Sequence, residues 1–142
     1  MLICVLAVAA ACGTAEGPEE QVRAWIEQGV EAAESKSRRE LVEMISPAYA
    51  DARGNGRDDI DKLLRLYFLR AQTVNLLPRV NDVRVIADEI AEVELTVGMA
   101  GATDSALGFS ADAYRFELEL ERDGDDWRLI SARWAEIGTA PW

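Results

Sequence analysis

The segment Tyr-Arg-Phe-Glu-Leu-Glu-Leu-Glu, residues 114–121, alternates apolar and charged side chains without exception. Because successive side chains of a β-strand point to opposite faces, this pattern predicts a strand with one buried face and one hydrated face. Residues 123–126, Asp-Gly-Asp-Asp, are turn formers, and residues 127–137 follow as a candidate last strand. The segment therefore predicts an antiparallel hairpin near the end of the sequence.

Two earlier segments show the same two-residue period. Residues 82–85 read Asp-Val-Arg-Val, and residues 92–97 alternate Glu, Glu and Thr with Val, Leu and Val. A tight connection at residues 87–89 would join the two segments as a hairpin. A short strand at residues 73–77 is left open, and Pro78 would confine it to a sheet edge because proline cannot donate a ladder hydrogen bond. We expect a sheet of four strands, mixed to antiparallel.

Three segments with helical spacing precede the predicted strands. Residues 18–33 begin with proline and two glutamates and place apolar side chains three and four positions apart. Residues 37–40, Ser-Arg-Arg-Glu, have the form of a capping box and predict the start of a short helix that ends at Ser46-Pro47. Asp58 is the expected cap of a third helix, which we expect to be the most enclosed because its apolar residues extend beyond one face. The chain is therefore predicted to be an α+β protein.

Composition and charge narrow the class of protein. At 142 residues the chain is long enough for one domain, and its formal net charge of −11 makes it strongly acidic. Binding to DNA or RNA depends mainly on cationic side chains that displace counterions from phosphates, so no nucleic-acid partner is expected. The chain has no histidine, which excludes a Ser-His-Asp or Cys-His nucleophile. A zinc site would have only carboxylates and cysteines as ligands, and we expect neither a metal nor a cofactor.

Residues 1–12, Met-Leu-Ile-Cys-Val-Leu-Ala-Val-Ala-Ala-Ala-Cys, form an uncharged apolar run. The run is too short for a membrane-spanning helix, which needs about 20 apolar residues, and it has the form of a secretory signal that closes in small residues. The small residues directly before Cys12 resemble the lipobox of bacterial lipoproteins, whose mature chain begins at a lipidated cysteine. This resemblance implies that Cys12 carries lipid. Plain secretion and a buried apolar N-terminal segment are the alternatives.

The predicted boundaries follow from this interpretation. Residues 1–11 are a cleaved signal peptide, residues 12–17 are the lipidated cysteine and a tether, residues 18–138 are the folded domain, and residues 139–142 are a C-terminal tail. We expect the mature protein on the periplasmic side of the cell envelope, attached to a membrane through its lipid. Gly13 after the cysteine resembles the sorting pattern of outer-membrane lipoproteins and favours the outer membrane over the inner one.

The order of elements and four local patterns carry a resemblance to a known superfamily. The patterns are Tyr49-x-Asp51-x-x-Gly54-x-x-Arg57, Leu63-Leu64-Arg65-x-Tyr67-Phe68-Leu69-Arg70, Tyr114-Arg115-Phe116 and Trp127-Arg128-Leu129. They resemble proteobacterial lipoproteins of the nuclear transport factor 2-like superfamily. The resemblance implies a cone-shaped roll, in which a curved sheet packs over three N-terminal helices, and a homodimer through the outer face of the sheet. It implies no particular reaction, because this superfold hosts both enzymes and binding modules.

Asp51 is the candidate residue that separates two functional interpretations. In a dry pocket, its carboxyl group would act as a general base with a raised pKa. Alternatively, Asp51 accepts backbone hydrogen bonds in the glycine-rich turn at residues 54–56, or pairs with Arg57, and so fixes the start of the third helix. Turn chemistry alone would produce the second arrangement. If the carboxylate caps a turn, Asp51 is not a catalytic base.

The other candidate pocket residues are aromatic or cationic. Tyr49, Tyr67 and Tyr114 lie in the patterns quoted above, although Tyr67 on its apolar helix face also fits a core position. Arg133 in the last strand would need a partner or an anionic ligand if it faced the concave side of the sheet. None of these residues matches a catalytic motif of superfamily enzymes, and we assign no catalytic residue.

Two functional hypotheses follow. The leading one is a non-catalytic envelope lipoprotein whose cone acts as a binding or interaction module, with a small apolar molecule as a candidate ligand. The alternative is a small-molecule isomerase or dehydratase that uses Asp51 with a tyrosine. An enclosed pocket with two or more convergent titratable side chains in strained pairing would count against the first hypothesis. An Asp51 carboxylate that faces solvent or caps a turn would count against the second.

Overall fold

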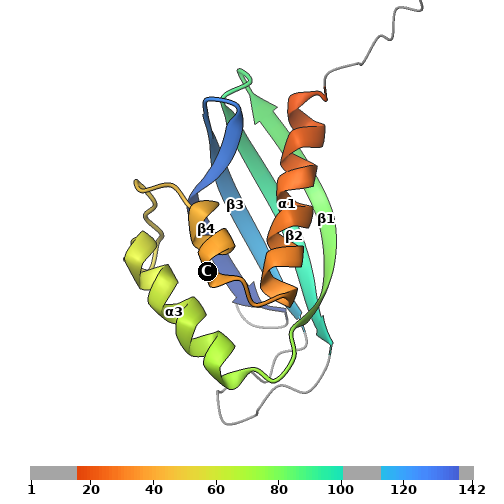
Figure 1. The fold of residues 1–142 in the computed structure, drawn as a ribbon. Coiled ribbons are helices and arrows are strands. Elements are labelled where there is room, and N and C mark those ends of the chain that lie inside the picture. Colours follow the sequence, from red (N-terminus) through yellow and green to blue (C-terminus); the bar gives the residue numbers. More distant parts are fainter. Residues whose placement is uncertain (1–15, 101–112, 138–142) are drawn as a thin grey trace, which may run out of the picture.

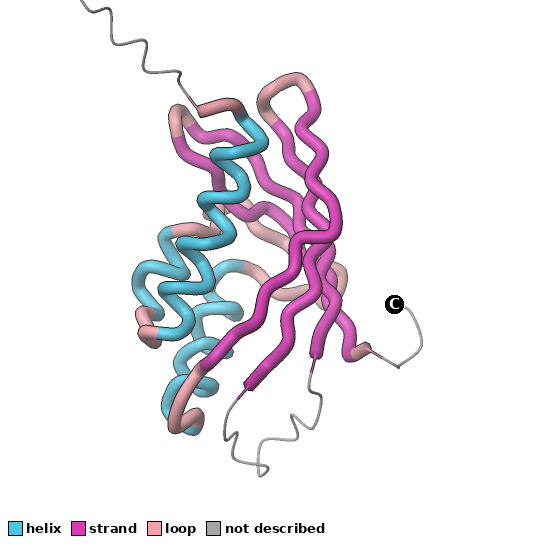
Figure 2. Tube along the Cα trace, turned by 90° about the vertical axis from the view of Figure 1, so that its right-hand side faces the viewer, coloured by secondary structure: helices cyan, strands magenta, loops and turns pink. Residues whose placement is uncertain are grey.

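Three helices cover one face of a four-strand sheet in the computed structural model, which describes residues 16–100 and 113–137 (Figures 1 and 2). The helices are α1 (Pro18–Glu34), α2 (Arg38–Glu43) and α3 (Arg57–Arg70), and the strands are β1 (Asn75–Ile86), β2 (Ile90–Ala100), β3 (Ala113–Asp123) and β4 (Asp126–Glu136). The strands are ordered β1-β2-β3-β4, and every neighbouring pair is antiparallel. The predicted α+β class with three helices and four strands is confirmed, and the sheet is antiparallel throughout rather than mixed.

β1 joins two segments that the sequence pattern separates at Pro78. The strand runs from Asn75 to Ile86 and pairs with β2 along its length. Pro78 is compatible with this position because β1 is an edge strand, where a backbone nitrogen can face away from the sheet. A bulge between Val80 and Asp82 shifts the register by one residue and keeps valines from both halves of the strand against the core. The predicted short strand is therefore the first part of β1 rather than a separate element.

The connection between β1 and β2 is as tight as expected. Ile86 pairs directly with Ile90, and the Glu89 N–H donates to the Ile86 carbonyl at 3.1 Å. Ala87 and Asp88 have φ values of 51° and 57°, in the left-handed region that residues other than glycine rarely occupy. The right-handed twist of paired strands favours turns of this hand, so the hairpin imposes a conformation that the two side chains disfavour.

The main core lies between α1 and the inner face of the sheet. It contains Val22 and Ile26 of α1, Ala91, Val93, Leu95 and Val97 of β2, Leu120 of β3, and Trp127 of β4. The predicted alternation in residues 114–121 is confirmed, because Leu120 is fully buried whereas Glu117 and Glu119 are exposed. The sheet therefore has an apolar inner face and a charged outer face.

α3 is much less buried than the sequence pattern indicates. None of its residues is buried, and Leu63, Leu66 and Leu69 have exposed fractions of 50, 49 and 74%. The helix packs mainly against α2, while Ile60 reaches a second apolar cluster that includes Tyr49. The expectation that α3 is the most enclosed helix is wrong, because it lies at the margin of the helix layer, where only one side meets the protein (Figure 1).

The start signals of α2 and α3 also differ from the expectation. Ser37 is the N-cap of α2, but its side chain makes no capping hydrogen bond to the first turn of that helix. Gly56 rather than Asp58 is the N-cap of α3, and its N–H donates to the Asp59 carboxylate at 2.9 Å. The third helical position is the one from which a carboxylate can reach back to the N-cap N–H, and Asp59 rather than Asp58 occupies it.

Several predictions fall on segments outside the described residues. These are the signal peptide, Cys12 with most of its tether, and the C-terminal tail. The predicted domain boundaries therefore stay predictions. Within the described part of the chain, no helix is both long enough and apolar enough to cross a membrane.

Candidate functional site

Asp51 is fixed in the turn that precedes α3. Its Oδ1 atom accepts the backbone N–H groups of Arg53 at 2.9 Å and Asn55 at 3.0 Å. Its Oδ2 atom accepts the Asn55 side-chain amide at 3.1 Å and the Tyr49 hydroxyl at 2.9 Å. Gly54 has a φ of 82°, which glycine adopts without strain. All four donors lie within four residues of Asp51, so the carboxylate caps a local turn.

These hydrogen bonds set the protonation of Asp51 and Tyr49. Burial alone would raise the pKa of Asp51, but the donors on Asn55, Tyr49 and Arg53 outweigh burial and hold that pKa below its usual value. Burial raises the pKa of Tyr49 far above its usual value, and the hydrogen bond to Asp51 and the negative charge of Asp51 add to the effect. A carboxylate that stays ionised and already accepts four hydrogen bonds is a poor proton acceptor. The geometry matches the turn interpretation and removes Asp51 as a candidate general base.

Arg57, the other suggested partner of Asp51, bonds to α2 instead. Its Nε and Nη2 atoms donate to the Val42 carbonyl at 3.1 and 2.9 Å. At the far end of α3, the Lys36 ammonium donates to the carbonyls of Ala71 and Gln72. Two cationic side chains thus fasten the two ends of α3 to the rest of the helix layer.

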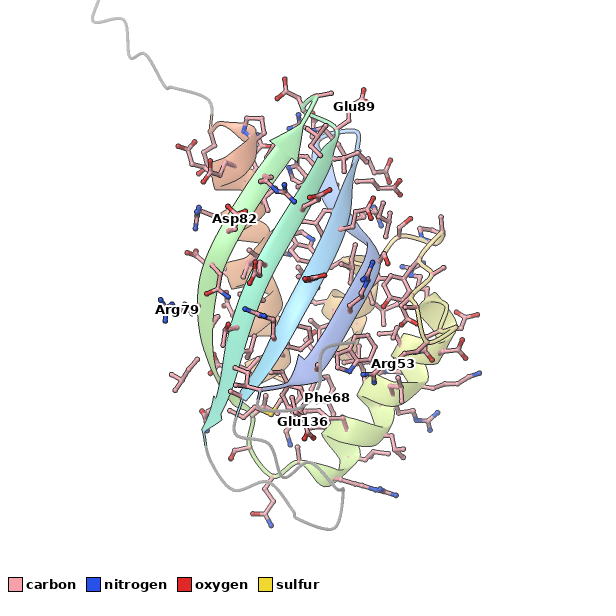
Figure 3. All side chains as sticks on the ribbon, turned by 180° about the vertical axis from the view of Figure 1, so that it is seen from behind. Arg53, Phe68, Arg79, Asp82, Glu89 and Glu136 are labelled. Carbon is pink, nitrogen blue, oxygen red and sulfur yellow. The ribbon has the colours of Figure 1, made fainter. Side chains whose placement is uncertain are left out.

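Arg133 lies on the outer face of the sheet. It is exposed and stands opposite Glu117 of β3, whereas its neighbours Ala132 and Trp134 pack against the inner apolar cluster. It lines a shallow charged depression with residues of all four strands, among them Asp82 of β1, which Figure 3 shows on this face. Strand alternation therefore places Arg133 outside the cone, and it does not belong to an interior site.

Aromatic side chains gather where α3 approaches the ends of β3 and β4. We call Tyr67, Phe68, Tyr114, Phe116 and Trp134, together with Glu136, the aromatic cluster. The ring centroids of Tyr67 and Phe68 are 5.7 Å apart, and those of Tyr114 and Phe116 are 6.3 Å apart. Strand register places Phe116 opposite Trp134 and Tyr114 opposite Glu136. Figure 3 labels Phe68 of α3 and Glu136 of β4.

Two tyrosine hydroxyls and one carboxylate form the polar part of the aromatic cluster. Burial raises the pKa of Tyr114, and the charge of Glu136, the proximity of Tyr67 and a hydrogen bond to Glu136 raise it further. Burial also raises the pKa of Tyr67. Both hydroxyls therefore stay protonated at neutral pH, and each can donate a hydrogen bond.

Arg53 connects the Asp51 turn to the aromatic cluster. Its guanidinium carbon lies 4.4 Å from the ring centroid of Trp134, and its Nη2 atom donates to the Trp134 carbonyl at 2.9 Å. This cation–π contact covers part of the indole ring. Because Asp51 holds the backbone N–H of Arg53, the turn positions Arg53 against the cluster.

The structure brings together only some of the residues predicted for a site. Tyr67 and Tyr114 belong to the aromatic cluster, whereas Tyr49, Asp51 and Arg57 organise the entry to α3. Sequence reasoning missed Glu136. The signal that could have found it is its spacing of two residues after Trp134, which places both side chains on one face of β4.

The aromatic cluster has the chemistry of a ligand site rather than a metal site. Within residues 16–100 and 113–137, no three acidic or cysteine side chains converge to hold a metal ion. The cluster offers two hydroxyl donors, one carboxylate acceptor and several ring faces. Such a set suits a mostly apolar molecule that carries one polar group.

The fold matches solved structures at low sequence identity. A ketosteroid isomerase-like protein from Erwinia carotovora atroseptica has a TM-score of 0.71 at 12% identity, with 88% of this chain and 100% of that chain covered. An NTF2-like protein from Cytophaga hutchinsonii has a TM-score of 0.70 at 10% identity, with coverages of 86 and 100%. A domain of unknown function with a cystatin-like fold from Nostoc punctiforme has a TM-score of 0.69 at 15% identity, with coverages of 89 and 81%.

Sequence comparison adds nothing to this structural similarity. No family model matches the chain, and no curated protein matches it. The solved structures establish the architecture alone, because their identities are too low to carry an activity across. The chain has the nuclear transport factor 2-like fold, an antiparallel curved sheet packed over three helices.

Proposed function

We propose that this protein is a lipid-anchored protein of the cell envelope whose folded domain binds a small, largely apolar molecule at the aromatic cluster. One observation carries the binding site: the Tyr114 hydroxyl lies near both Glu136 and Tyr67, among aromatic rings. The rings would bury the apolar part of the ligand, and a hydroxyl would donate to its polar group.

Binding fits the site better than catalysis through Asp51. That carboxylate is held by four donors in a turn and has no free role in proton transfer. In the cluster itself, burial and the nearby charge of Glu136 raise the pKa of the Tyr114 hydroxyl and keep it neutral. A ligand would compete for a hydroxyl that is neutral and preorganised, which is the property of a recognition group.

The lipid anchor is the part of this proposal that rests on sequence alone. It is supported by the apolar run that ends in three alanines directly before Cys12. The intact mass of protein isolated from a membrane fraction would test it, because lipidation at Cys12 removes residues 1–11 and adds acyl chains. A Cys12→Ala variant should then move to the soluble fraction. An unmodified Cys12 in membrane-extracted protein would contradict the anchor.

The ligand site can be tested with Nile red, a neutral apolar dye whose fluorescence changes on binding and which carries a carbonyl acceptor. We expect the protein to bind the dye and a Tyr114→Phe variant to bind it about tenfold more weakly, because one hydrogen bond is lost. Tyr49→Phe is the matched control, since that hydroxyl is engaged by Asp51. Equal effects of the two variants, or no dye binding at all, would contradict the proposed site.

A second candidate function is proton-transfer catalysis at the same cluster, with Glu136 in place of Asp51. The observation that favours it is the contact between the Glu136 carboxylate and the Tyr114 hydroxyl. Among the similar structures are the ketosteroid isomerase-like protein and a candidate dehydratase from Streptomyces avermitilis, with a TM-score of 0.70 at 16% identity. Ultraviolet assays of double-bond migration in a β,γ-unsaturated ketone would test it, with Glu136→Gln as the inactive control.

A further inference from the structure

The exposed side of α3 is apolar and cationic, unlike the rest of this acidic protein. We define the α3 surface as Lys62, Leu63, Arg65, Leu66, Leu69 and Arg70. Its three leucines are 50, 49 and 74% exposed. At about 100° per residue, the six side chains fall within roughly 160° of the helix circumference, so they share one side.

The charges of the α3 surface lack strong partners. Residues 62–70 carry three positive charges and no negative charge, whereas the whole chain has a net charge of −11. Lys62 lies 4.0 Å from Asp59 on the same helix, and neither Arg65 nor Arg70 forms an ion pair with any described residue. Exposed leucines beside two unpaired arginines are typical of a contact surface rather than of a hydrated helix face.

A surface of opposite character lies between α1 and β1. This open groove has a volume of about 490 Å³ and a mostly apolar lining. We define the α1 groove by its lining residues, Glu27, Val30, Glu31, Glu34, Ser35 and Pro78. None of its three glutamates forms an ion pair with another residue in the described part of the chain. The groove therefore combines apolar surface with three unpaired negative charges.

We propose that the α3 surface of one molecule docks in the α1 groove of a second copy. The leucines would cover the apolar lining, and the three cations would face the three glutamates. The helices that carry the two surfaces, α3 and α1, lie on the same side of the sheet (Figures 1 and 2). The proposed dimer is symmetric: a two-fold rotation repeats the contact in the opposite direction and closes it. This inference does not depend on the lipid anchor or on the ligand site.

Two other occupants fit the charges less well. An anionic bilayer placed against the helix layer would meet the glutamates of α1 as well as the cations of α3. The glutamates would repel its negatively charged lipids. On the outer face of the sheet, Glu92 stands directly opposite Glu119, and Glu94 stands directly opposite Glu117. Glu92 and Glu94 form ion pairs with Arg84 and Arg115. Burying that face in a symmetric dimer would desolvate both ion pairs together with the two glutamates opposite them.

Sedimentation equilibrium of the full chain, over a concentration series in density-matched detergent, tests the dimer. We expect a monomer–dimer equilibrium for the unaltered protein. Arg65→Glu with Arg70→Glu, and separately Glu27→Lys with Glu31→Lys, should each weaken dimerisation about tenfold or more by opposing like charges. An equimolar mixture of the two double variants should restore the dimer, because both contacts in the mixed dimer then pair opposite charges.

Three results would overturn the proposal. The first is a monomer at every concentration of the unaltered protein. The second is a dimer that neither double variant weakens but that an outer-face variant, Glu117→Lys with Glu119→Lys, does weaken. The third is a failure of the mixture to restore the dimer although both double variants keep the circular dichroism spectrum and the melting temperature of the unaltered protein.

Discussion

α1 and α3 both carry apolar side chains at helical spacing, but the protein holds them in different ways. α1 buries Val22, Ile26 and Ala32, the first two against the sheet, whereas α3 buries no residue. α3 is instead attached at its ends, where Arg57 and Lys36 donate to backbone carbonyls. A helix at the margin of the layer offers only one side to the core, so apolar residues spread around its circumference stay exposed. The confinement of apolar residues to one stripe therefore indicates burial better than their number does.

The two modes of attachment have different consequences for motion. The buried face of α1 cannot separate from the sheet without exposing core side chains, so α1 should open only with the whole domain. α3 can open once the hydrogen bonds at its ends break and Ile60, Tyr67 and Phe68 leave their half-buried contacts, because this costs less apolar burial than the opening of α1. Local opening of α3 is therefore expected at a lower free energy than opening of α1.

The largest expected effect tests this contrast directly. Ile26→Ala in α1 should lower the free energy of unfolding by about 3 kcal/mol, because it leaves a cavity in the main core. Leu66→Ala in α3 is the matched change and should cost less than about 0.5 kcal/mol, because that side chain is 49% exposed. Urea denaturation of both variants measures the two values. Similar losses would show that the two helices are held alike.

The next effect concerns the turn that leads into α3. Asp51→Ala should lower the free energy of unfolding by about 2 kcal/mol, because four donors lose their acceptor. The hydrogen bonds lower the pKa of Asp51 in the folded state, so its contribution is present above the unfolded pKa of about 3.9 and is lost as the pH falls through the folded pKa. The difference between the unaltered protein and the variant should therefore shrink in acid.

Asp58→Ala is a control for the Asp51 prediction. Asp58 is exposed in the first turn of α3, and its side chain makes no hydrogen bond with the described residues. Its removal should change stability by less than about 0.5 kcal/mol. A loss for Asp51→Ala that stays constant from neutral pH into acid would contradict the role of the ionised carboxylate.

A smaller effect separates attachment at the ends from attachment along the face. Arg57→Met removes both hydrogen bonds to Val42 and should lower the free energy of local opening by about 1 kcal/mol. Hydrogen exchange should accelerate in residues 57–70 and stay unchanged in α1. Arg23→Met is the matched control, since Arg23 forms only an exposed pair with Glu19. Uniform acceleration across both helices would show that α3 does not open independently.

The sequence pattern predicted the sheet better than the helix layer. Alternation in residues 114–121 depends only on which face of a strand is buried, and β3 follows it. Burial of α3 depends on how much of its circumference other elements cover, which spacing cannot report. The two parts of β1 could not be joined from the pattern, because the bulge between Val80 and Asp82 reverses the alternation within one strand.

The candidate site was predicted in part for a related reason. Tyr67 and Tyr114 were named from local patterns, but their meeting depends on how α3 lies across the end of β3. Glu136 was missed because its position opposite Tyr114 depends on the register of β3 and β4, which a bulge at Glu119 and Leu120 shifts. Asp51 was ambiguous because the same residue types serve a turn or a dry pocket, and only the donors around it decide between them.

The smallest expected effect is a change in the pKa of Tyr67, which reports whether α3 stays in place. The chain has three tyrosines, so Tyr49→Phe with Tyr114→Phe leaves Tyr67 of α3 as the only one. Burial raises the pKa of Tyr67, so its ultraviolet titration should lie above the ordinary value of about 10. The stability that the neutral ring contributes is present below the unfolded pKa of about 10 and should be lost as the pH rises through the raised folded pKa. Adding Arg57→Met should move the titration back toward 10, because an open helix exposes the ring. If the pKa of Tyr67 stays raised in the variant with Arg57→Met, the contacts of the inner side of α3 are enough to keep the helix in place. The difference between α1 and α3 would then be only one of degree.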